Sequence, residues 1–214
     1  MAIVGQTTTL NCGAACLLCA AIELNRNPIL GNAPVGSKIE ALGQAGVPFG
    51  ISNAWLDAIY DISGAGQAGY SLPSGIIAAA RLLGMTPTVI MANTNTVNFL
   101  QRQYPHEIAA CRNETERRDS ANLGDLTLGA GERAMHCVRI GMTPAVHWVL
   151  QRDDNTYMDP AGGATPLNIT QGGGDRTGRA NMKATGQSVD VSMCCISTTL
   201  TVTYHGTGLA IKLV

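Results

Sequence analysis

The order of helix-like and strand-like segments predicts an α+β fold for this chain. Segments with helical periodicity fill most of the first half, and apolar runs typical of strands follow in the second half. With 214 residues the chain is most simply one domain, which would bury about 70% of its unfolded surface. Apolar residues make up 45% of the chain and charged residues 14%, so we expect a packed core rather than disorder.

Five segments are expected to form helices. The first begins at Asn11, a good N-cap residue, and continues through small and apolar residues to about Leu24. In the fourth segment, Ser74 is the candidate cap and Gly84 the stop. The five are residues 11–24, 37–46, 52–63, 74–84 and 96–104.

Strands are expected mainly in the second half. Their apolar and β-branched runs contrast with the charge-dense segment 112–125, which predicts a solvated loop or helix face, and with the glycine-rich loop 161–187. The expected strands are residues 86–91, 134–140, 144–151, 156–160, 189–204 and 209–214.

These elements divide a single domain, residues 1–214, into three parts. Residues 1–103 are expected to form a mainly helical lobe, and residues 134–214 a mainly β lobe. Residues 104–133 are expected to be a charged insertion between the two.

Charge, hydropathy and cysteine content exclude several classes of partner and location. A net charge of −1 gives no electrostatic reason to expect nucleic acid or an anionic membrane as a partner. No run reaches the roughly 18 to 20 apolar residues of a spanning helix, and the first residues lack a secretory signal pattern. Seven cysteines, an odd number clustered in apolar segments, predict reduced thiols in a soluble protein of a reducing compartment. Export by a signal-less route into the cytoplasm of a target cell would leave the same pattern.

Three cysteines near the start, Cys12, Cys16 and Cys19, allow three interpretations. Their Cys-x3-Cys-x2-Cys spacing matches the iron–sulfur loop of radical S-adenosylmethionine enzymes, but such a loop must bend. The intervening residues favour a helix, so we expect no cluster, metal or other cofactor. On a helix the three positions share one face, where Cys16 and Cys19 are expected to pack as small hydrophobic residues.

Cys12 differs because it lies in the first turn of the expected helix. Unpaired backbone N–H groups and the positive end of the helix dipole lower the pKa of a thiol there and favour a nucleophilic thiolate. Residues 13–15 are small and are expected to leave room for a substrate. Gln6 is either an ordinary surface glutamine or, on an extended approach, an amide donor that forms an oxyanion hole with the Cys12 N–H.

A cysteine nucleophile needs a histidine base, and His147 is the best of the four histidines. Its surroundings predict a strand, a polar turn and a second strand that ends at Pro160. Twelve residues separate His147 from Asp159, so a hairpin centred near Asp153 would place both on one face, directly opposite in a symmetric turn. Asp159 would then hold one ring nitrogen while the other faces Cys12. The histidines set aside are His106, His136 and His205.

The residues around Cys12 and His147 resemble those of the papain-like cysteine peptidases. The resemblance rests on Gln6, on Asn-Cys-Gly-Ala-Ala-Cys-Leu at residues 11–17, and on His-Trp-Val-Leu and Asp-Pro-Ala-Gly at residues 147–150 and 159–162. The layout is closest to domains that process double-glycine leaders of bacteriocins, and to papain-fold effector proteases and toxins of pathogenic bacteria. It covers residues 5 to about 163 in pieces.

This resemblance implies Cys12 as nucleophile, His147 as base, Asp159 as orienting acid and Gln6 as oxyanion donor. It also implies a papain-like fold, in which an N-terminal helical lobe carrying the nucleophile packs on a C-terminal antiparallel β-sheet. The implied function is a cysteine protease that cleaves a protein or peptide, as a bacterial effector or toxin. An activator, or an immunity or inhibitor protein, is the further partner that such a toxin implies.

Two alternatives stay open. A glutamine deamidase or amidase would use the same thiol chemistry, and an inactive papain-like module would bind a peptide or partner without cleaving it. The intact Cys12, His147 and Asp159 argue against the inactive module. Long segments between the motifs, and residues 164–214 after them, leave the substrate open.

Overall fold

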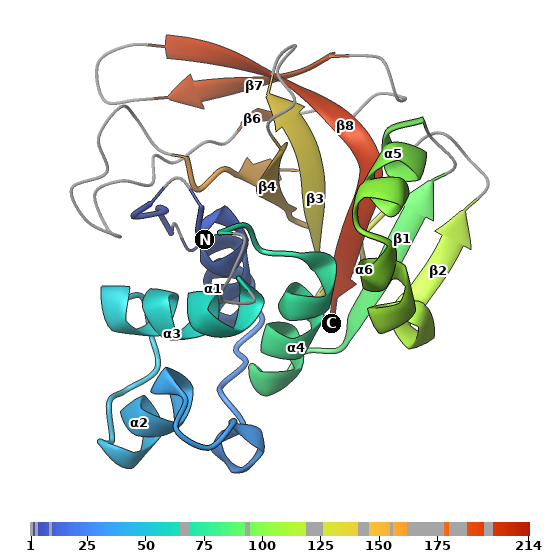
Figure 1. Ribbon diagram of the computed structural model, residues 1–214. Helices are drawn as coiled ribbons and strands as arrows, with labels where there is room; N and C mark the ends of the chain where they lie inside the picture. Colours follow the sequence, from blue (N-terminus) through green and yellow to red (C-terminus); the bar gives the residue numbers. More distant parts are fainter. Residues whose placement is uncertain are drawn as a thin grey trace.

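Helices pack against one face of a mixed β-sheet in the computed structural model of the chain (Figure 1). The predicted α+β class is therefore confirmed. The structure describes residues 2, 4–8, 10–64, 69–92, 95–118, 126–140, 146–154, 156–161, 178–179, 188–194 and 199–214. The expected loop at 161–187 lies almost wholly outside the described residues.

All five expected helices are present within a residue or two of their predicted bounds. Two of them begin with a capping serine: Ser37 accepts a hydrogen bond from the Glu40 N–H, and Ser52 accepts one from the Trp55 N–H. The helices and 3-10 turns are α1 (Cys12–Glu23), η1 (Leu30–Asn32), α2 (Lys38–Gln44), α3 (Asn53–Ser63), α4 (Pro73–Leu82), α5 (Asn95–Gln103), α6 (Pro105–Ala110) and η2 (Arg112–Glu114).

The start of α4 differs from the prediction. Ser74 was the candidate cap, but the helix begins at Pro73, so Ser74 lies inside its first turn. The Ser74 N–H and hydroxyl both donate to the carboxylate of Glu107 on α6, each at 2.8 Å. Gly84, whose φ of +72° suits glycine, follows the end of the helix as predicted.

The sheet has the strand order β2-β1-β8-β3-β4-β5-β6, and β7 pairs with β8 off this path. Every described pairing is antiparallel except that of β1 with β2, which is parallel. The strands are β1 (Pro87–Ala92), β2 (Thr115–Arg118), β3 (Arg133–Ile140), β4 (Val146–Gln151), β5 (Thr156–Met158), β6 (Gly178–Arg179), β7 (Ser188–Cys194) and β8 (Thr199–Leu213).

Three expectations about the sheet were wrong. It is not purely antiparallel or C-terminal, because β1 from the helical half lies between β2 and β8. The charged segment was expected to be a solvated loop or helix face, but its residues 115–118 form strand β2, since an edge strand needs backbone partners but no apolar face. The two runs expected at 189–204 and 209–214 are divided differently, because β8 continues unbroken from Thr199 to Leu213.

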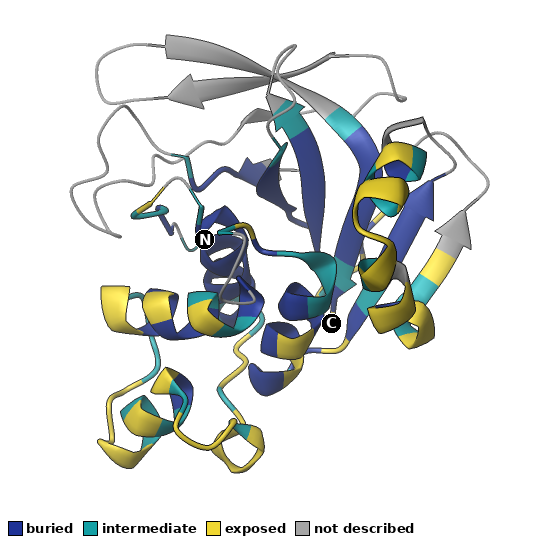
Figure 2. Cartoon of the chain, in the orientation of Figure 1, coloured by how far each residue is buried: buried dark blue, intermediate teal, exposed yellow. Residues whose placement is uncertain are grey.

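The main core lies between the helices and the sheet (Figure 2). α1 is buried from Cys12 to Ala21, while α2 and α3 expose their outer sides. α1 packs on α3 and on β4, and α4 packs on β1. This buried position of α1 holds its first residue, Cys12, next to strand β4. Within the described part of the chain, no helix is long and apolar enough to cross a membrane.

Candidate active site

Cys12 is the first residue of α1 and its side chain is buried. Asn11 occupies the N-cap position, but its side chain does not cap the helix as predicted. Instead its Oδ1 accepts hydrogen bonds from the N–H groups of Thr7 and Thr8, each at 3.2 Å. The side chain of Asn11 therefore ties down the preceding loop, and the first N–H groups of the helix stay available around the sulfur.

His147 lies on β4, and Asp159 lies just past the end of β5. The register pairs Leu150 with Met158 and Gln151 with Tyr157, so the hairpin is centred at residue 154 and not at 153. Asp159 is therefore a diagonal neighbour of His147 and not directly opposite, as predicted for a symmetric turn. The even spacing still leaves both on one face, because a register shift of two residues preserves the alternation.

His147 connects the cysteine to the acid. Its Nε2 donates to Oδ1 of Asp159 at 2.8 Å, and the same Oδ1 accepts the Ala161 N–H at 2.8 Å. Nδ1 is the ring nitrogen left for the side-chain hydrogen bond between His147 and Cys12. The carboxylate of Asp159 is fully buried, so it fixes the tautomer and orientation of the ring.

The electrostatics of this trio favour a thiolate–imidazolium pair. Burial by itself would raise the pKa of the Cys12 thiol, but the His147 charge and hydrogen bond, with the backbone of Trp148 and Gly13, bring the pKa below its usual value. Burial likewise opposes the charged form of His147, but the charges of Asp159 and the Cys12 thiolate raise the pKa of His147 to about 10. A thiol with a lowered pKa beside a protonated imidazole is an activated nucleophile.

The two other cysteines of α1 are packed and hydrogen-bonded. Cys16 donates its thiol to the Trp148 carbonyl at 3.4 Å, and Cys19 donates to the Ala2 carbonyl at 3.3 Å. Burial is the main reason that the pKa of Cys16 lies well above its usual value and that of Cys19 rises to about 12. Because α1 is continuous through all three positions, the bend of an iron–sulfur loop is missing.

Gln6 lies beside the acid end of the trio. Its N–H donates to the Pro160 carbonyl at 2.9 Å, and Pro160 directly follows Asp159. The Gln6 Oε1 is buried and, within the described residues, makes no hydrogen bond. Rotation of the amide by half a turn would place an N–H donor at the same buried position. An oxyanion-binding role for Gln6 remains a prediction.

The small residues after Cys12 do not serve as predicted. They were expected to leave room for a substrate, but Ala14 and Ala15 are fully buried. The missing side chain of Gly13 makes room for Ser71, whose Cβ would lie 2.5 Å from a Cβ built at Gly13.

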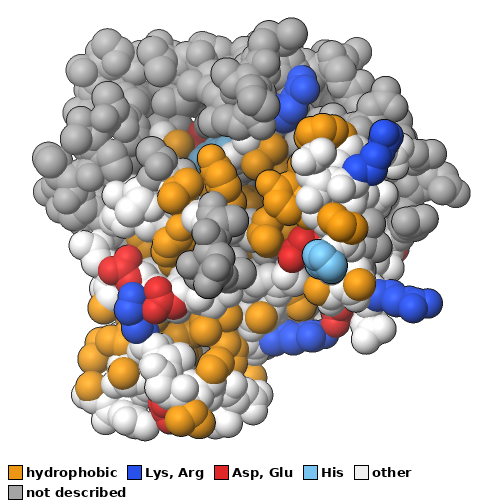
Figure 3. Space-filling view, viewed as in Figure 1, with side chains coloured by type: hydrophobic (Ala, Val, Ile, Leu, Met, Phe, Trp, Pro, Cys, Tyr) orange, Lys and Arg blue, Asp and Glu red, His pale blue; other side chains and the backbone are white. Residues whose placement is uncertain are grey.

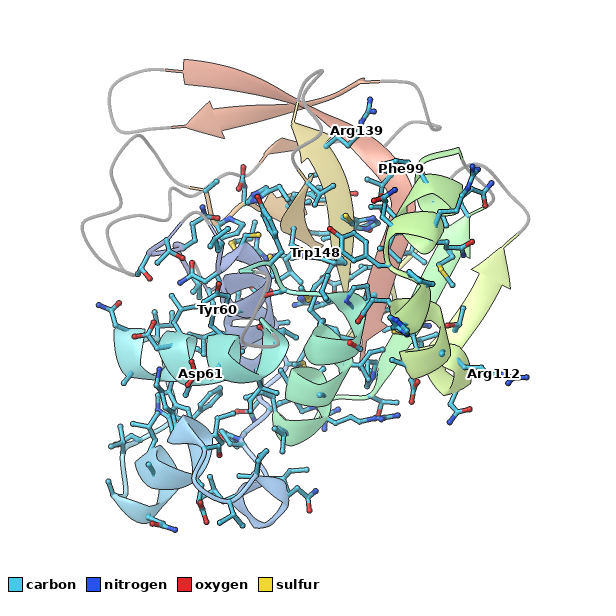
Figure 4. All side chains as sticks on the ribbon, in the orientation of Figure 1. Tyr60, Asp61, Phe99, Arg112, Arg139 and Trp148 are labelled. Carbon is cyan, nitrogen blue, oxygen red and sulfur yellow. The ribbon has the colours of Figure 1, made fainter. Side chains whose placement is uncertain are left out.

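Ser71 is a part of the site that no sequence pattern pointed to. Its carbonyl accepts the indole N–H of Trp148 at 3.0 Å, and its hydroxyl shares a hydrogen bond with Ser63 at 3.1 Å. Trp148 lies at the centre of the molecule between the helices and the sheet (Figure 4). This contact fixes the residue that follows His147 against the loop beside Cys12.

Two of the remaining histidines are placed by the structure. His106 is exposed on α6. His136 is fully buried on β3, where its Nε2 hydrogen-bonds Oε1 of Gln151 at 2.6 Å. Burial lowers the pKa of His136 to about 4, so it is a neutral core residue. The side chain of His205 lies outside the described residues.

A cavity of about 300 Å³ lies beside Trp148. Its lining is mostly apolar and includes Val146, Met91, Leu209 and Phe99. Hydrophobic side chains also gather across the middle of the face of the molecule that Figure 3 shows. The lining includes Trp148 and Ser71, which lie beside Gly13, but none of Cys12, His147 and Asp159.

Within the described residues, no group of three or more His, Cys, Asp or Glu side chains is arranged to hold a metal ion. The contacts of Cys12, His147 and Asp159 fit nucleophilic attack by a thiolate with proton transfer through an imidazole.

Comparison with known proteins gives two matches. A family model described as invasion plasmid antigen J, cysteine protease, matches residues 5–193. The cysteine protease IpaJ of Shigella flexneri is 31% identical over 171 residues, which are 72% of this chain and 62% of that protein. The chain thus spans less than two thirds of the length of this relative. No solved structure matches. The predicted class, a cysteine protease related to bacterial enzymes, is confirmed at the level of the family.

Proposed function

Because the chain belongs to the invasion plasmid antigen J family of cysteine proteases, we propose that it cleaves a peptide bond in a protein or peptide substrate through Cys12. One observation carries this proposal: the Cys12 thiol hydrogen-bonds His147, whose Nε2 donates to Asp159 at 2.8 Å. This chain of contacts supports Cys12 as nucleophile, His147 as base and Asp159 as orienting acid.

In the first step the Cys12 thiolate attacks the carbonyl carbon of the scissile bond. A C–S bond forms and the carbonyl oxygen becomes an oxyanion, for which the Cys12 N–H and the Gln6 amide would be donors. The C–N bond then breaks as the His147 imidazolium gives its proton to the leaving amine. The products of this half-reaction are a free amine and a thioester on Cys12.

In the second step water hydrolyses the thioester. Neutral His147 takes a proton from water as the oxygen attacks the acyl carbon, and the Cys12 thiolate leaves. A carboxylic acid is released and the ion pair is restored. Asp159, fully buried and hydrogen-bonded to Nε2, keeps the ring oriented and favours its protonated form in both steps.

The fold we propose is papain-like, with residues 1–214 as a single domain. A helical layer carrying the nucleophile packs against strands carrying the base and acid, which supports this assignment. The apolar cavity beside Trp148 would receive an apolar part of the substrate. Charged residues are absent from the described lining except for Glu107.

We also propose that the protein acts as a bacterial effector or toxin in the reducing cytoplasm of a target cell. The free, buried thiols of Cys16, Cys19, Cys111 and Cys137 support a reducing setting. An activator, or an immunity or inhibitor protein, would be its partner in such a role. The likeness to the Shigella protease supports this origin without identifying the substrate.

The test is mass spectrometry of eukaryotic and bacterial protein extracts incubated with the protein or with Cys12→Ala. Proteolysis predicts new peptide termini that the variant does not produce. A gain of about one dalton at glutamine, with no new termini, would instead identify the deamidase reaction. The absence of both changes would leave the proposed protease without its activity and overturn it.

Alkylation tests the nucleophile independently of any substrate. Iodoacetamide at pH 6 should label Cys12 faster than every other cysteine, because Cys12 alone has a lowered pKa among the buried thiols of the described residues. Equal labelling of all thiols would show that Cys12 is not activated. That result would favour an inactive binding module.

A further inference from the structure

Glu23, the last residue of α1, is held by two arginines in a nearly buried cluster. Its Oε1 lies 2.9 Å from Nε of Arg152, and its Oε2 lies 2.8 Å from Nε of Arg133. The side chains of Glu23 and Arg152 are 5% and 3% exposed, and that of Arg133 is 12% exposed. Charges this far from water persist only when they are well paired, so their geometry is specified.

The cluster also binds the segment that precedes Cys12. The Ala2 N–H donates to Oε1 of Glu23 at 2.9 Å, and the Ala2 carbonyl accepts from Nη2 of Arg152 at 2.9 Å. Cys19 donates its thiol to the same carbonyl at 3.3 Å. Ala2 is therefore fixed through both its backbone N–H and its backbone carbonyl.

The other end of this segment is fixed next to the trio. Gln6 donates its N–H to the Pro160 carbonyl at 2.9 Å, and Val4, between the two anchors, is fully buried. Four residues span at most about 14 Å when extended, so the anchor at Ala2 limits how far Gln6 can lie from it. The position of Gln6 thus depends on the anchor at Ala2.

We propose that Arg152, acting with Glu23, is a positioning residue that holds residues 2–6 so that the Gln6 amide reaches the oxyanion. This inference rests on the proposed function, in which Gln6 stabilises the oxyanion formed on attack by Cys12. In this role Arg152 is a positioning residue and not a catalytic one. It acts through the Ala2 carbonyl and the short segment that follows.

Two reactions of Cys12 separate positioning of Gln6 from activation of the thiol. Acylation by p-nitrophenyl acetate passes through a tetrahedral oxyanion, whereas alkylation by iodoacetamide is a direct displacement without one. Each rate is measured at Cys12 by peptide mass spectrometry. The ratio of acylation to alkylation then reports oxyanion stabilisation alone, with no need for the natural substrate.

Arg152→Lys should lower this ratio about tenfold while leaving the alkylation rate within twofold, since a shift of about 1 Å in a catalytic group has effects of this size or larger. Lysine keeps the charge beside Glu23 but cannot also donate to Ala2 with a rigid fork. Arg133→Lys is the matched control, because Arg133 binds the same carboxylate with no described contact to Ala2. Its ratio should stay within twofold of wild type.

The decisive variant combines Gln6→Ala with Arg152→Lys. Gln6→Ala should lower the ratio about 100-fold or more, and adding Arg152→Lys should change it no further. A further tenfold fall in the double variant would show that Arg152 acts elsewhere and would overturn the proposal. An unchanged ratio in Arg152→Lys would do the same.

Other outcomes separate this proposal from the one it rests on. If Gln6→Ala leaves the ratio unchanged, the oxyanion role of Gln6 fails and the positioning role fails with it, while Cys12 can still be the nucleophile. If Cys12 alkylates no faster than the other thiols, the proposed function itself fails. Should Arg152→Lys not fold in thermal melts, Cys19→Ala removes a second donor to the Ala2 carbonyl and should lower the ratio by a smaller factor. No change in that variant would overturn the proposal.

Discussion

Replacing His147 with glutamine should slow alkylation of Cys12 by at least about 30-fold at pH 6. Glutamine keeps a hydrogen-bond donor for the buried Asp159 carboxylate but cannot carry a positive charge. The variant therefore removes the main cause of the lowered Cys12 pKa while keeping the polar contact.

The magnitude follows from a neighbouring thiol on the same helix. Cys19 is buried like Cys12 but has no imidazolium partner in its environment, and burial is the main cause that raises its pKa to about 12. Because the pKa of Cys12 lies below 9.0, a rise toward about 12 lowers the thiolate fraction by at least about 1000-fold. The more basic thiolate is also the better nucleophile. For a change of about 1000-fold in thiolate fraction and a Brønsted slope of 0.4 to 0.5, its rate constant for attack rises about 16- to 32-fold and offsets part of the loss. The net loss is therefore at least about 30-fold.

The assay is the rate of iodoacetamide labelling at the peptide that contains Cys12. His136→Gln is the matched control, because His136 is also a buried strand histidine but its pKa of about 4 leaves it neutral at pH 6. This control should label Cys12 at the wild-type rate. Thermal melts of both variants establish that each is folded.

The reasoning would be refuted if His147→Gln labelled within twofold of the wild-type rate. The lowered pKa of Cys12 would then come from the helix N-terminus and its N–H groups rather than from His147. A slow rate in both histidine variants would instead indicate a general loss of structure around β3 and β4.

Three further changes test other parts of the site. Gly13→Ala should destabilise the protein by about 1–2 kcal/mol, because overlap with Ser71 outweighs the gain in helix propensity; a thermal melt measures this, and Ser71→Gly should restore the melting temperature. Asp159→Asn should shift the alkaline limb of the pH–rate profile for substrate cleavage to lower pH. Burial lowers the pKa of His147, and the variant removes the carboxylate charge that helps to raise this pKa to about 10. An alkaline limb that does not move would contradict this. Cys16→Ala should keep the labelling rate of the nucleophile within twofold and lose about 1 kcal/mol in urea unfolding, through the lost hydrogen bond to the Trp148 carbonyl.

Local patterns predicted the elements of this fold well and their pairing less well. Periodicity placed the five helices, because each buries one face and the spacing of apolar residues records that face. β2 escaped prediction, since its Thr-Glu-Arg-Arg sequence has no apolar alternation and it is held by parallel pairing with β1. The order of strands in the sheet depends on such distant pairings.

Capping shows the same limit at single residues. Asn11 and Ser74 are the residue types expected at helix starts, and both lie within one position of a helix start. Each side chain binds something else: Asn11 binds the loop before it, and Ser74 binds Glu107, 33 residues away. A short polar side chain takes the best partner within reach, and tertiary contacts determine which partners are within reach.

By itself the sequence determined that Cys12 begins a buried helix and that His147 and Asp159 share a face, because helix periodicity and strand alternation depend only on spacing along the chain. Only the tertiary structure decided that β4 lies against α1, so that the imidazole meets the thiol. It also decided that the hairpin is centred one residue later than expected and that Ser71 fills the space at Gly13. These contacts join residues far apart in the chain, and packing of the whole core selects them.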